Sequence, residues 1–418
     1  MTHVLIIVEN LPVPLDRRVW QQATALVRAG FAVSVICPKA GKHVAAFDEL
    51  EGVRIYRHGL PVEGKGIPHY ALEYIWAWLA ELILTARVYN RRPIDIIQAC
   101  NPPDNIFLIG IIFRLLFGTK FIFDHHDPAA SLFALKFPRR RLLQKVVNWF
   151  ERQSLRSADH VVTTSEQLRT LAIDDCGVHE ARITLVRSGF DMNRVPPVVG
   201  DAALKRGRRF MALYVGIMGE QDGIDLLLAA ISIIVHRFRR DDIHFVLAGG
   251  GAQLPAMKAL AERLQISEHV EFTGYLEGVA LYRLFTTADI GLSPDPKNDF
   301  NDKLSMNKIL EYMAFGLPII QFNLNEGRVL ASDASVYAGD GEPDSFAIAI
   351  TNLLDSPDRR AAMSAYGKKR VRKLFPWSRQ EEIYVGLYKS VAAGRLAGKP
   401  AHASGEMLAA LKPSRRDV

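Results

Sequence analysis

The sequence contains little cysteine: Cys37, Cys100 and Cys176 are its three thiols, and they lie far apart. An odd number of cysteines with no metal-binding spacing excludes a disulfide framework and a zinc-finger type of site. Free thiols at this low density are typical of a reducing compartment. The sequence therefore predicts a fold that depends on its own core for stability.

Long apolar runs are also missing. The two best candidates, residues 74–86 and 106–117, are short, and each carries a charged residue, so neither is predicted to span a bilayer. The chain opens with Met1-Thr2-His3 and passes directly into a strand pattern, which predicts no signal peptide. These features predict a cytoplasmic protein without a membrane-spanning segment.

Neither sign of charge dominates. The 52 basic and 45 acidic residues give a net charge of +7, which favours anionic surfaces in general and does not by itself indicate nucleic acid. Apolar residues make up 49% and charged residues 23% of the chain, as in globular proteins. A chain of 418 residues exceeds the usual size of one core, so two domains of about 200 residues are expected.

The first half alternates short apolar runs with helical patterns. A helix is predicted over residues 16–29, with Asp16 as N-cap and Gly30 at its C-terminal end. Continuous Val/Ile runs separated by helices are typical of a parallel sheet covered on both faces. The strands are predicted at residues 4–8, 31–37, 94–97, 120–123 and 161–164.

The same pattern begins again after Pro196-Pro197. Strands are predicted at residues 210–215, 244–248, 270–273 and 290–292, and helices at 225–237, 255–264 and 281–287. The chain is therefore expected to be α/β, with two separate doubly wound sheets and ligands at the strand C-termini. We expect domains at 1–197 and 205–375, a helix within 376–393, and a disordered tail at 394–418.

The most informative stretch is residues 307–318. It places one carboxylate, Glu311, early in an apolar helix that stops at Gly316 before a buried strand pattern. A helix start after a polar loop binds anions through its unpaired N–H groups, and a lone carboxylate near a phosphate suits a sugar diol. The stretch resembles the nucleotide-sugar motif of retaining glycosyltransferases of family 4, which have the GT-B fold.

Further matches follow in the family's order. They are the Gly turn after strand 246–248, the turn Phe272–Tyr275, and the segments 288–289 and 293–294. The resemblance implies two Rossmann-like domains facing a cleft, a C-terminal helix that crosses back to the first domain, and neither cofactor nor metal. It implies a donor site formed by Gly216, Gly219, Gly250, Gly274, Tyr275, Lys303, Asn307, Lys308 and Glu311.

The sequence departs from the family pattern in two places. Lys303 stands where the family usually has a Glu, eight residues before Glu311, while Ile217 and Asp222 stand where it has Arg and Lys. We hypothesise that Lys303 and Lys308 supply the missing positive charge to the diphosphate from the opposite side. The alternative is that both lysines are solvated and the site is degenerate. The variant turn resembles that of a bacterial subgroup linked to cell-surface polysaccharide or glycolipid assembly.

Two histidines follow the predicted strand 120–123. Because adjacent residues of an extended chain point to opposite sides, His125 and His126 are not expected to bind one metal ion. The family resemblance implies that His126, followed by Asp127, contacts the donor sugar; His125, or a histidine satisfied in the core, are the alternatives. On the acceptor side, the resemblance places the charged residues Asp16, Arg17 and Arg18, in a loop that faces the cleft in GT-B enzymes. Either arginine could meet an anionic acceptor or the donor phosphates, and an exposed capping turn is the alternative.

Two helical patterns are amphipathic. In residues 70–89 a broad apolar face opposes a narrow stripe that contains Glu73 and Glu81, and we expect the apolar face to pack in the core. In residues 138–156 one face carries Arg141, Lys145, Arg152 and Arg156, with Trp149 at its boundary. This second pattern is typical of a helix on an anionic lipid surface, although a surface helix packed on the sheet has the same pattern.

Together these features predict a retaining, metal-independent glycosyltransferase on the inner face of the plasma membrane. It would move a sugar from a nucleotide-diphosphate donor to a lipid-linked or polysaccharide acceptor, with an anionic membrane surface as partner and no nucleic acid. Two alternatives remain: a GT-B nucleotide-sugar epimerase, which needs acid and base groups and no acceptor, and a non-catalytic nucleotide-binding protein.

Overall fold

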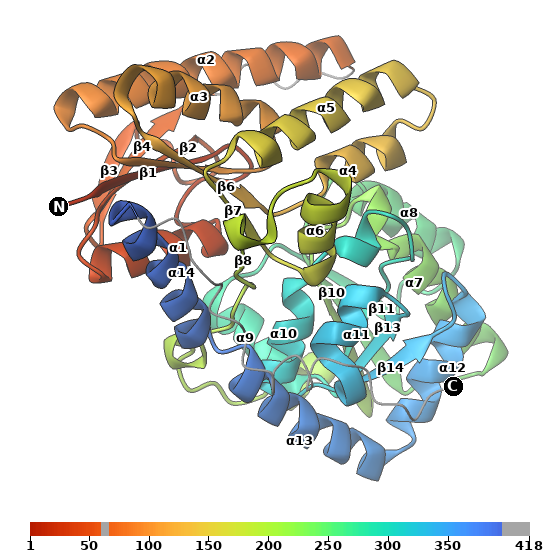
Figure 1. The fold of residues 1–418 in the computed structure, drawn as a ribbon. Helices are drawn as coiled ribbons and strands as arrows, with labels where there is room; N and C mark the ends of the chain where they lie inside the picture. Colours follow the sequence, from red (N-terminus) through yellow and green to blue (C-terminus); the bar gives the residue numbers. More distant parts are fainter. Residues whose placement is uncertain (60–66, 395–418) are drawn as a thin grey trace. The chain divides into compact units, whose positions relative to one another are not determined.

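The computed structural model describes residues 1–59 and 67–394. The chain forms two compact units (Figure 1). Of the described residues, the first unit contains Met1–Arg187 together with residues 379–394, and the second contains Ser188–Ser378. The tail predicted to be disordered lies, from residue 395, outside the described residues.

The first unit is built on an eight-stranded sheet of order β3-β4-β2-β1-β5-β6-β7-β8. All pairs are parallel except β3 with β4. The predicted parallel sheet thus carries one antiparallel strand at its edge that the sequence did not indicate; there Glu51 and Gly52 adopt positive φ values and close a tight hairpin. The strands are β1 (His3–Val8), β2 (Ala32–Pro38), β3 (Phe47–Leu50), β4 (Val53–His58), β5 (Ile96–Cys100), β6 (Lys120–His125), β7 (His160–Thr163) and β8 (Ile183–Leu185).

Helices cover both faces of this sheet (Figure 1). Helices α1 (Arg17–Arg28) and α14 (Trp377–Ala392) pack on one face, while α2 (Ile67–Arg91), α3 (Phe107–Phe117) and α5 (Arg141–Ser157) pack on the other. The shorter helices α4 (Ala129–Lys136) and α6 (Glu166–Thr170) follow β6 and β7. As predicted, Asp16 caps α1 by accepting the Val19 N–H at 3.0 Å.

The C-terminal helix α14 belongs to the first unit from Arg379 onward, as the sequence predicted. Tyr384 and Tyr388 are fully buried in the core on the α1 face of the sheet. Both hydroxyls donate to the side-chain oxygen of Gln98 on β5. The end of the chain therefore completes the core of the unit that the beginning of the chain forms.

Helix α2 faces the opposite way from the prediction. Its apolar residues Leu72, Ile75, Trp76, Leu79 and Ile83 are between 43% and 64% exposed, whereas Glu81 is 1% exposed. The buried stripe consists of Ala77, Glu81, Thr85 and Val88, spaced three or four residues apart. Small residues on this stripe let the helix lie close to the sheet, and a carboxylate goes into the interior with them.

The second unit is built on a six-stranded parallel sheet of order β11-β10-β9-β12-β13-β14. Its strands are β9 (Phe210–Val215), β10 (Ile243–Ala248), β11 (Val270–Gly274), β12 (Ile290–Ser293), β13 (Ile319–Phe322) and β14 (Ser335–Ala338). Its helices are α7 (Ile224–Ser232), continued as a π-helix (Ile233–Arg237), α8 (Leu254–Arg263), α9 (Gly278–Thr287), α10 (Asn307–Phe315), α11 (Asn325–Ala331), α12 (Pro343–Leu354) and α13 (Pro357–Leu374). Two apolar cores, one on each face of the sheet, make it doubly wound.

Candidate functional site

The predicted donor residues of the second unit gather at one edge of its sheet. Because β11, β10, β9 and β12 are parallel neighbours, the loops after their carboxyl ends lie next to one another. Gly274 ends β11 and Tyr275 follows it, Gly250 lies in the loop after β10, and Gly216 and Gly219 lie in the loop after β9. The structure thus brings together residues that lie up to 59 positions apart, and α10 begins beyond the neighbouring strand β12.

The backbones of the glycine turns after β9 and β10 pack directly against each other. A Cβ on Gly249 would lie 1.8 Å from the Gly216 carbonyl oxygen, and one on Gly251 would lie 2.6 Å from that of Met218. The Met218 N–H donates to the Gly250 carbonyl at 2.8 Å. A Cβ on Gly250 would meet no atom within 4 Å. Two of these glycines are therefore required by packing, and Gly250 leaves open space at the strand end.

The variant turn after β9 is closed by a hydrogen bond to the side chain of Asp222, which lies in the same turn. The Asp222 carboxylate accepts the Gly219 N–H at 2.8 Å, so this N–H already has an anionic partner within its turn. Ile217, at the other variant position, is 65% exposed. The two residues that replace the family's cations thus form a capped turn with an apolar side chain on its surface.

Helix α10 is held to the sheet by Tyr312, which sequence analysis missed. Its fully buried hydroxyl accepts the Val215 N–H at 2.9 Å and lies 3.1 and 3.0 Å from the Leu213 and Leu292 carbonyls, to which it can donate. A Cβ on Gly291 would lie 2.5 Å from the Tyr312 ring, so β12 needs a glycine there. The tyrosine fixes the helix that carries Glu311.

Along α10, Asn307 is exposed at the first position and Glu311 is buried, at 6% exposure, one turn later. The N-cap residue Met306 has no capping side-chain hydrogen bond. The first N–H groups of the helix thus lack an acceptor from a capping side chain. This arrangement suits an anion at the helix start and a hydroxyl-bearing group near the carboxylate.

Both lysines that were predicted to meet the diphosphate lie beside aspartates. Lys308 Nζ lies 2.7 Å from Asp295 Oδ2, with the side chains 10% and 2% exposed, and it also lies 4.8 Å from the centre of the Tyr214 ring. Lys303 Nζ lies 2.8 Å from Asp299 Oδ1. The hypothesis of relocated positive charge stays a prediction, and it now requires that a phosphate share Lys308 with Asp295.

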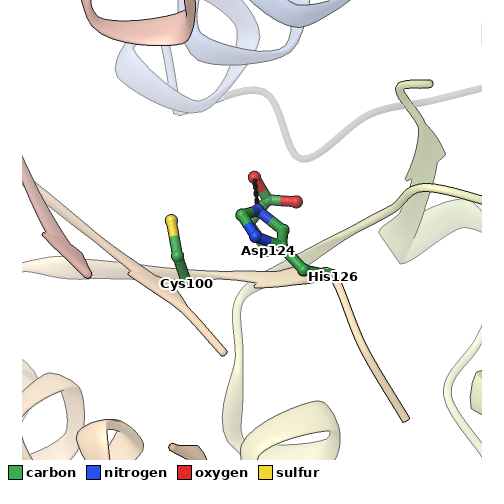
Figure 2. Close-up of side chains that lie close together, drawn as sticks. All are labelled: Cys100, Asp124 and His126. Atoms are coloured by element: carbon green, nitrogen blue, oxygen red, sulfur yellow. Dashed lines mark ion pairs between the residues drawn. The ribbon is translucent and has the colours of Figure 1, made fainter. Parts of the chain in front are cut away.

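In the first unit, the end of β6 distributes its side chains by strand alternation, as predicted. His125 is buried with its Nε2 3.1 Å from Glu151 of α5. Asp124 points to the opposite face, and His126 Nε2 lies 2.9 Å from its Oδ2 (Figure 2). His125 is thus a core histidine that pairs with Glu151 through one ring nitrogen while its Nδ1 has no hydrogen-bond partner among the described residues, and His126 is the histidine that lies beside Asp124 at the strand end.

Asp124 is the centre of this cluster, and sequence analysis did not identify it. It is fully buried and accepts from Arg18 at 2.9 Å, from Gln22 at 2.6 Å and from Gln98 at 3.3 Å. Burial is the largest single effect and opposes its charge, but Arg18 and His126 together outweigh burial and hold the pKa of Asp124 below its ordinary value. The carboxylate is ionised at neutral pH.

The same contacts show that Arg18, one of the residues predicted for the acceptor side, lies in the interior. Arg18 is 8% exposed and binds Asp124 and the Val186 carbonyl, the latter at 2.9 Å. It is therefore a buried structural cation and is not displayed to an acceptor. Arg17 is exposed, and Asp16 uses its carboxylate as the helix cap. Among these three predicted acceptor residues, Arg17 is the one whose side chain lies at the surface.

His126 carries a proton in this setting. Burial favours the neutral ring, but the Asp124 carboxylate outweighs burial and raises the pKa of His126 to about 10. Arg18 Nε also lies 3.0 Å from His126 Nε2. One nitrogen cannot accept from Arg18 and donate to Asp124 at once. The ionised carboxylate at 2.9 Å favours the second arrangement, an imidazolium that donates to Asp124.

Cys100 completes a group with Asp124 and His126 whose ligand atoms lie within 4.8 Å of one another (Figure 2). A thiol, a carboxylate and an imidazole can bind zinc. Here the carboxylate is already neutralised by Arg18 at 2.9 Å, and a metal ion would have to displace this cation. The group is better described as an ion-pair network that positions His126.

The loop that follows β6 is held by Asn101, another residue that sequence analysis missed. Its side-chain oxygen accepts the His126 N–H at 2.6 Å and the Asp127 N–H at 3.3 Å, and its amide donates to the Asp127 carbonyl at 2.7 Å. Burial raises the pKa of the Asp127 carboxyl. Asn101, Gln22 and Gln98 are common polar residues in segments far apart in sequence, so no motif indicated them.

Comparison with known proteins adds two family matches. Residues 15–189 match the model of a glycosyl transferase 4-like domain, and residues 201–370 match the model of glycosyl transferases group 1. Among curated proteins, the D-inositol 3-phosphate glycosyltransferase of Kineococcus radiotolerans is 26% identical over 273 residues, which cover 60% of this chain and 61% of that protein. The chain spans 59–61% of the length of three such relatives.

Solved structures show the same fold. Sucrose-phosphate synthase from Thermosynechococcus elongatus superimposes with a TM-score of 0.78 at 20% identity, over 94% of this chain and all of that one. Anabaena HepE, solved in complex with UDP and glucose, superimposes with a TM-score of 0.69 at 14% identity, again over 94% of this chain and all of the other.

Proposed function

The chain belongs to glycosyltransferase family 4 and has the GT-B fold, and on this premise we propose that it transfers a sugar from a nucleotide-diphosphate donor to a lipid-linked or polysaccharide acceptor. The observation that carries the proposal is the edge of the second sheet, where the open Gly250 turn lies among the strand-end loops and α10 presents Glu311. The donor class is supported by HepE, a protein of the same fold that binds UDP and glucose.

Each group at this edge has a part that its chemistry allows. The space at Gly250 and the first N–H groups of α10 would bind the diphosphate, which gains negative charge as it leaves. Glu311 would accept two hydrogen bonds from the ribose hydroxyls. Tyr275, 61% exposed, would contact the base. In the first unit, the protonated His126 would donate to the donor sugar, with Asp124 holding its ring in place.

The acceptor proposal rests on one face of the first unit. On α5, Leu142 and Trp149 are 76% and 52% exposed, and Arg141 and Lys145 are exposed with them. The outward apolar residues of α2 lie on the same face of the sheet (Figure 1). Apolar residues beside cations suit the headgroup region of an anionic bilayer. None of the described helices is both long and apolar enough to cross a membrane, so the proposed association is at the surface.

The activity can be tested by screening nucleotide-diphosphate-sugars for a rise in melting temperature, since a ligand that binds only the folded state stabilises it. The stabilising donors, labelled in the sugar, are then incubated with lipid-linked and glycan acceptors. Label transferred to an acceptor supports the proposal. An epimerised nucleotide-sugar without transfer would indicate an epimerase, and tight binding without turnover on any acceptor would indicate a binding protein.

A further inference from the structure

The first unit contains a second group of titratable side chains, away from His126. Glu9 directly follows β1, His58 is the last residue of β4, and Glu81 lies in the middle of α2. Their exposed fractions are 9%, 6% and 1%. One carboxylate oxygen of each Glu and one ring nitrogen of His58 lie within 4.8 Å of one another. Two carboxylates and an imidazole thus converge in the interior.

Strand alternation explains why these side chains meet. On β1, Leu5 and Ile7 point to the face that α2 covers, and Glu9 continues their side. On β4, Tyr56 points to the same face, and His58 continues it. Glu81 reaches them from above because it belongs to the inward stripe of α2 with Ala77 and Thr85. The arrangement follows from the fold and does not depend on one flexible side chain.

In the described part of the chain, the cluster contains two carboxylates and one histidine, and neither Lys nor Arg. Among the described residues, neither Glu81 oxygen has a hydrogen-bond partner, and Glu9 Oε2 lies 3.0 Å from His58 Nε2 without forming a hydrogen bond. No ion pair of the described residues brings Lys or Arg to Glu9 or Glu81; the nearby Arg57 binds the Val13 and Ala45 carbonyls and lies 3.5 Å from Asp48. Buried carboxylates need a cation, a metal ion or a proton.

We propose that Glu9, His58 and Glu81 bind a divalent transition-metal ion, with Zn²⁺ or Mn²⁺ as the class of ligand. Two oxygen donors and one imidazole nitrogen suit these ions, and a charge of +2 balances two carboxylates beside a neutral histidine. The ion would join the ends of β1 and β4 to α2. Its role would be structural, and the inference does not depend on the proposed sugar transfer.

The cluster of Cys100, Asp124 and His126 differs from this one in the cation that its carboxylate meets. There, Arg18 lies 2.9 Å from the carboxylate and takes the place of a metal ion. Here, two carboxylates face each other, and burial together with Glu9 raises the pKa of Glu81 well above its ordinary value. The alternative to the proposal is a protonated carboxyl within the cluster.

The test uses the full-length protein, freed of metal with a chelator, and Co²⁺ as a spectroscopic probe, with Zn²⁺ as competitor. We expect one equivalent of Co²⁺ to bind, with visible ligand-field bands and without the near-ultraviolet charge-transfer band of a cobalt thiolate, so that binding at Cys100 is distinguished. Glu81→Gln and Glu9→Gln should each weaken Co²⁺ binding by at least roughly 100-fold, since removing a direct ligand costs more than removing an outer partner. The control is Glu73→Gln on the same helix, which should bind Co²⁺ like the wild type.

A second measurement keeps the test valid if a variant folds poorly. Zn²⁺ should raise the melting temperature of the wild type and of Glu73→Gln, and a chelator should reverse the rise. No saturable Co²⁺ binding by the wild type would overturn the proposal, as would a thiolate charge-transfer band. A Glu81→Gln protein that is as stable as the wild type, with no response of either protein to Zn²⁺, would establish the protonated cluster instead.

Discussion

At the scale of single residues, buried charges determine what the site can do. Asp124 and Asp295 are both almost fully buried; Asp124 lies next to Arg18 and His126, and Asp295 lies next to Lys308. Removing one partner of such a pair leaves an uncompensated charge, whereas removing both can be nearly neutral. This difference makes it possible to separate a structural role from a binding role at either position.

Lys308 is the residue where that separation matters most. Lys308→Met should destabilise the protein by about 3–5 kcal/mol, because it leaves the Asp295 carboxylate buried and unpaired. The double variant Lys308→Met/Asp295→Asn should regain most of this stability. If a phosphate shares Lys308, the double variant should still bind the nucleoside diphosphate roughly 10- to 150-fold more weakly, with little change for the nucleoside. Thermal melting and calorimetric titration measure the two effects; equal losses for both ligands would contradict the relocated charge.

Glu311 should be required for donor binding. Replacing it by Ala removes the acceptor of two hydroxyl hydrogen bonds, each typically worth about 1.5–3 kcal/mol when the acceptor is charged. We expect turnover to fall by at least about 100-fold, with the far-ultraviolet circular dichroism unchanged. Glu262→Ala, an exposed acid on α8, serves as the control. Wild-type donor affinity in the Glu311 variant would show that the carboxylate has another role.

His126 gives a prediction of pH dependence. Its pKa is raised from the ordinary 6.5 to about 10 in the folded protein, so the folded state holds the proton more tightly than the unfolded state. The stability from the His126–Asp124 pair is thus fully present below about pH 6.5 and is lost as the pH rises toward 10. Melting curves between these values should show the decline, and His126→Gln should flatten it. A wild-type profile that is level across this window would refute the charged pair.

At the scale of secondary-structure elements, α2 shows which part of the fold the sequence could predict. Its helical periodicity predicted a helix, and the helix is there. Which of its faces turns inward was predicted wrongly. The inward stripe contains Ala77 and Thr85, which allow a close approach to the sheet, and Glu81, which meets Glu9 and His58 from segments far away in sequence. Periodicity fixes which residues share a face, but not which face turns inward when both faces carry apolar residues.

The outward face of α2 and the basic residues of α5 should act together on a membrane. Arg141→Glu with Lys145→Glu should release the protein from vesicles that contain anionic lipid, and salt should do the same to the wild type because it screens the attraction. Ile75→Ser with Ile83→Ser should weaken vesicle binding while changing stability little, since both side chains are over half exposed.

The matched control for charge is Arg372→Glu with Lys373→Glu on α13, two exposed residues of the second unit. This variant carries the same change in net charge and should still sediment with anionic vesicles. Equal release of both charge variants would show that net charge alone drives binding, and binding that is unaffected by salt or by any of these substitutions would exclude the proposed surface.

At the scale of the whole molecule, features that are contiguous in sequence could be predicted, whereas contacts between segments far apart in sequence could not. Local motifs were sufficient to predict two Rossmann-like units, and to name the glycine turns and the α10 stretch that the structure places at the strand ends of the second sheet, because each motif is contiguous in sequence. The network around Asp124 was beyond such motifs. Its members come from α1, β5 and β6, which are far apart in sequence, so their proximity exists only in the folded first unit; α14 docks beside them through the Tyr384 hydroxyl, which donates to Gln98.

That docking predicts the effect of truncation. Helix α14 places Tyr384, Leu387, Tyr388 and Val391 in the core of the first unit, and their burial contributes roughly 6–12 kcal/mol at about 1.5–3 kcal/mol per side chain. Since a whole domain is typically stable by only about 5–15 kcal/mol, a chain that ends at Ser378 should lose the cooperative melting transition of its first unit. The second unit has its own two cores and should keep its transition, which calorimetry should recognise because the proposed ligand, a nucleoside diphosphate, should raise its melting temperature. Tyr388→Phe removes one of the two hydroxyls that donate to Gln98, and it should lower the free energy of unfolding of the first unit by only about 1 kcal/mol. Retention of both transitions after truncation would show that the first unit folds without α14.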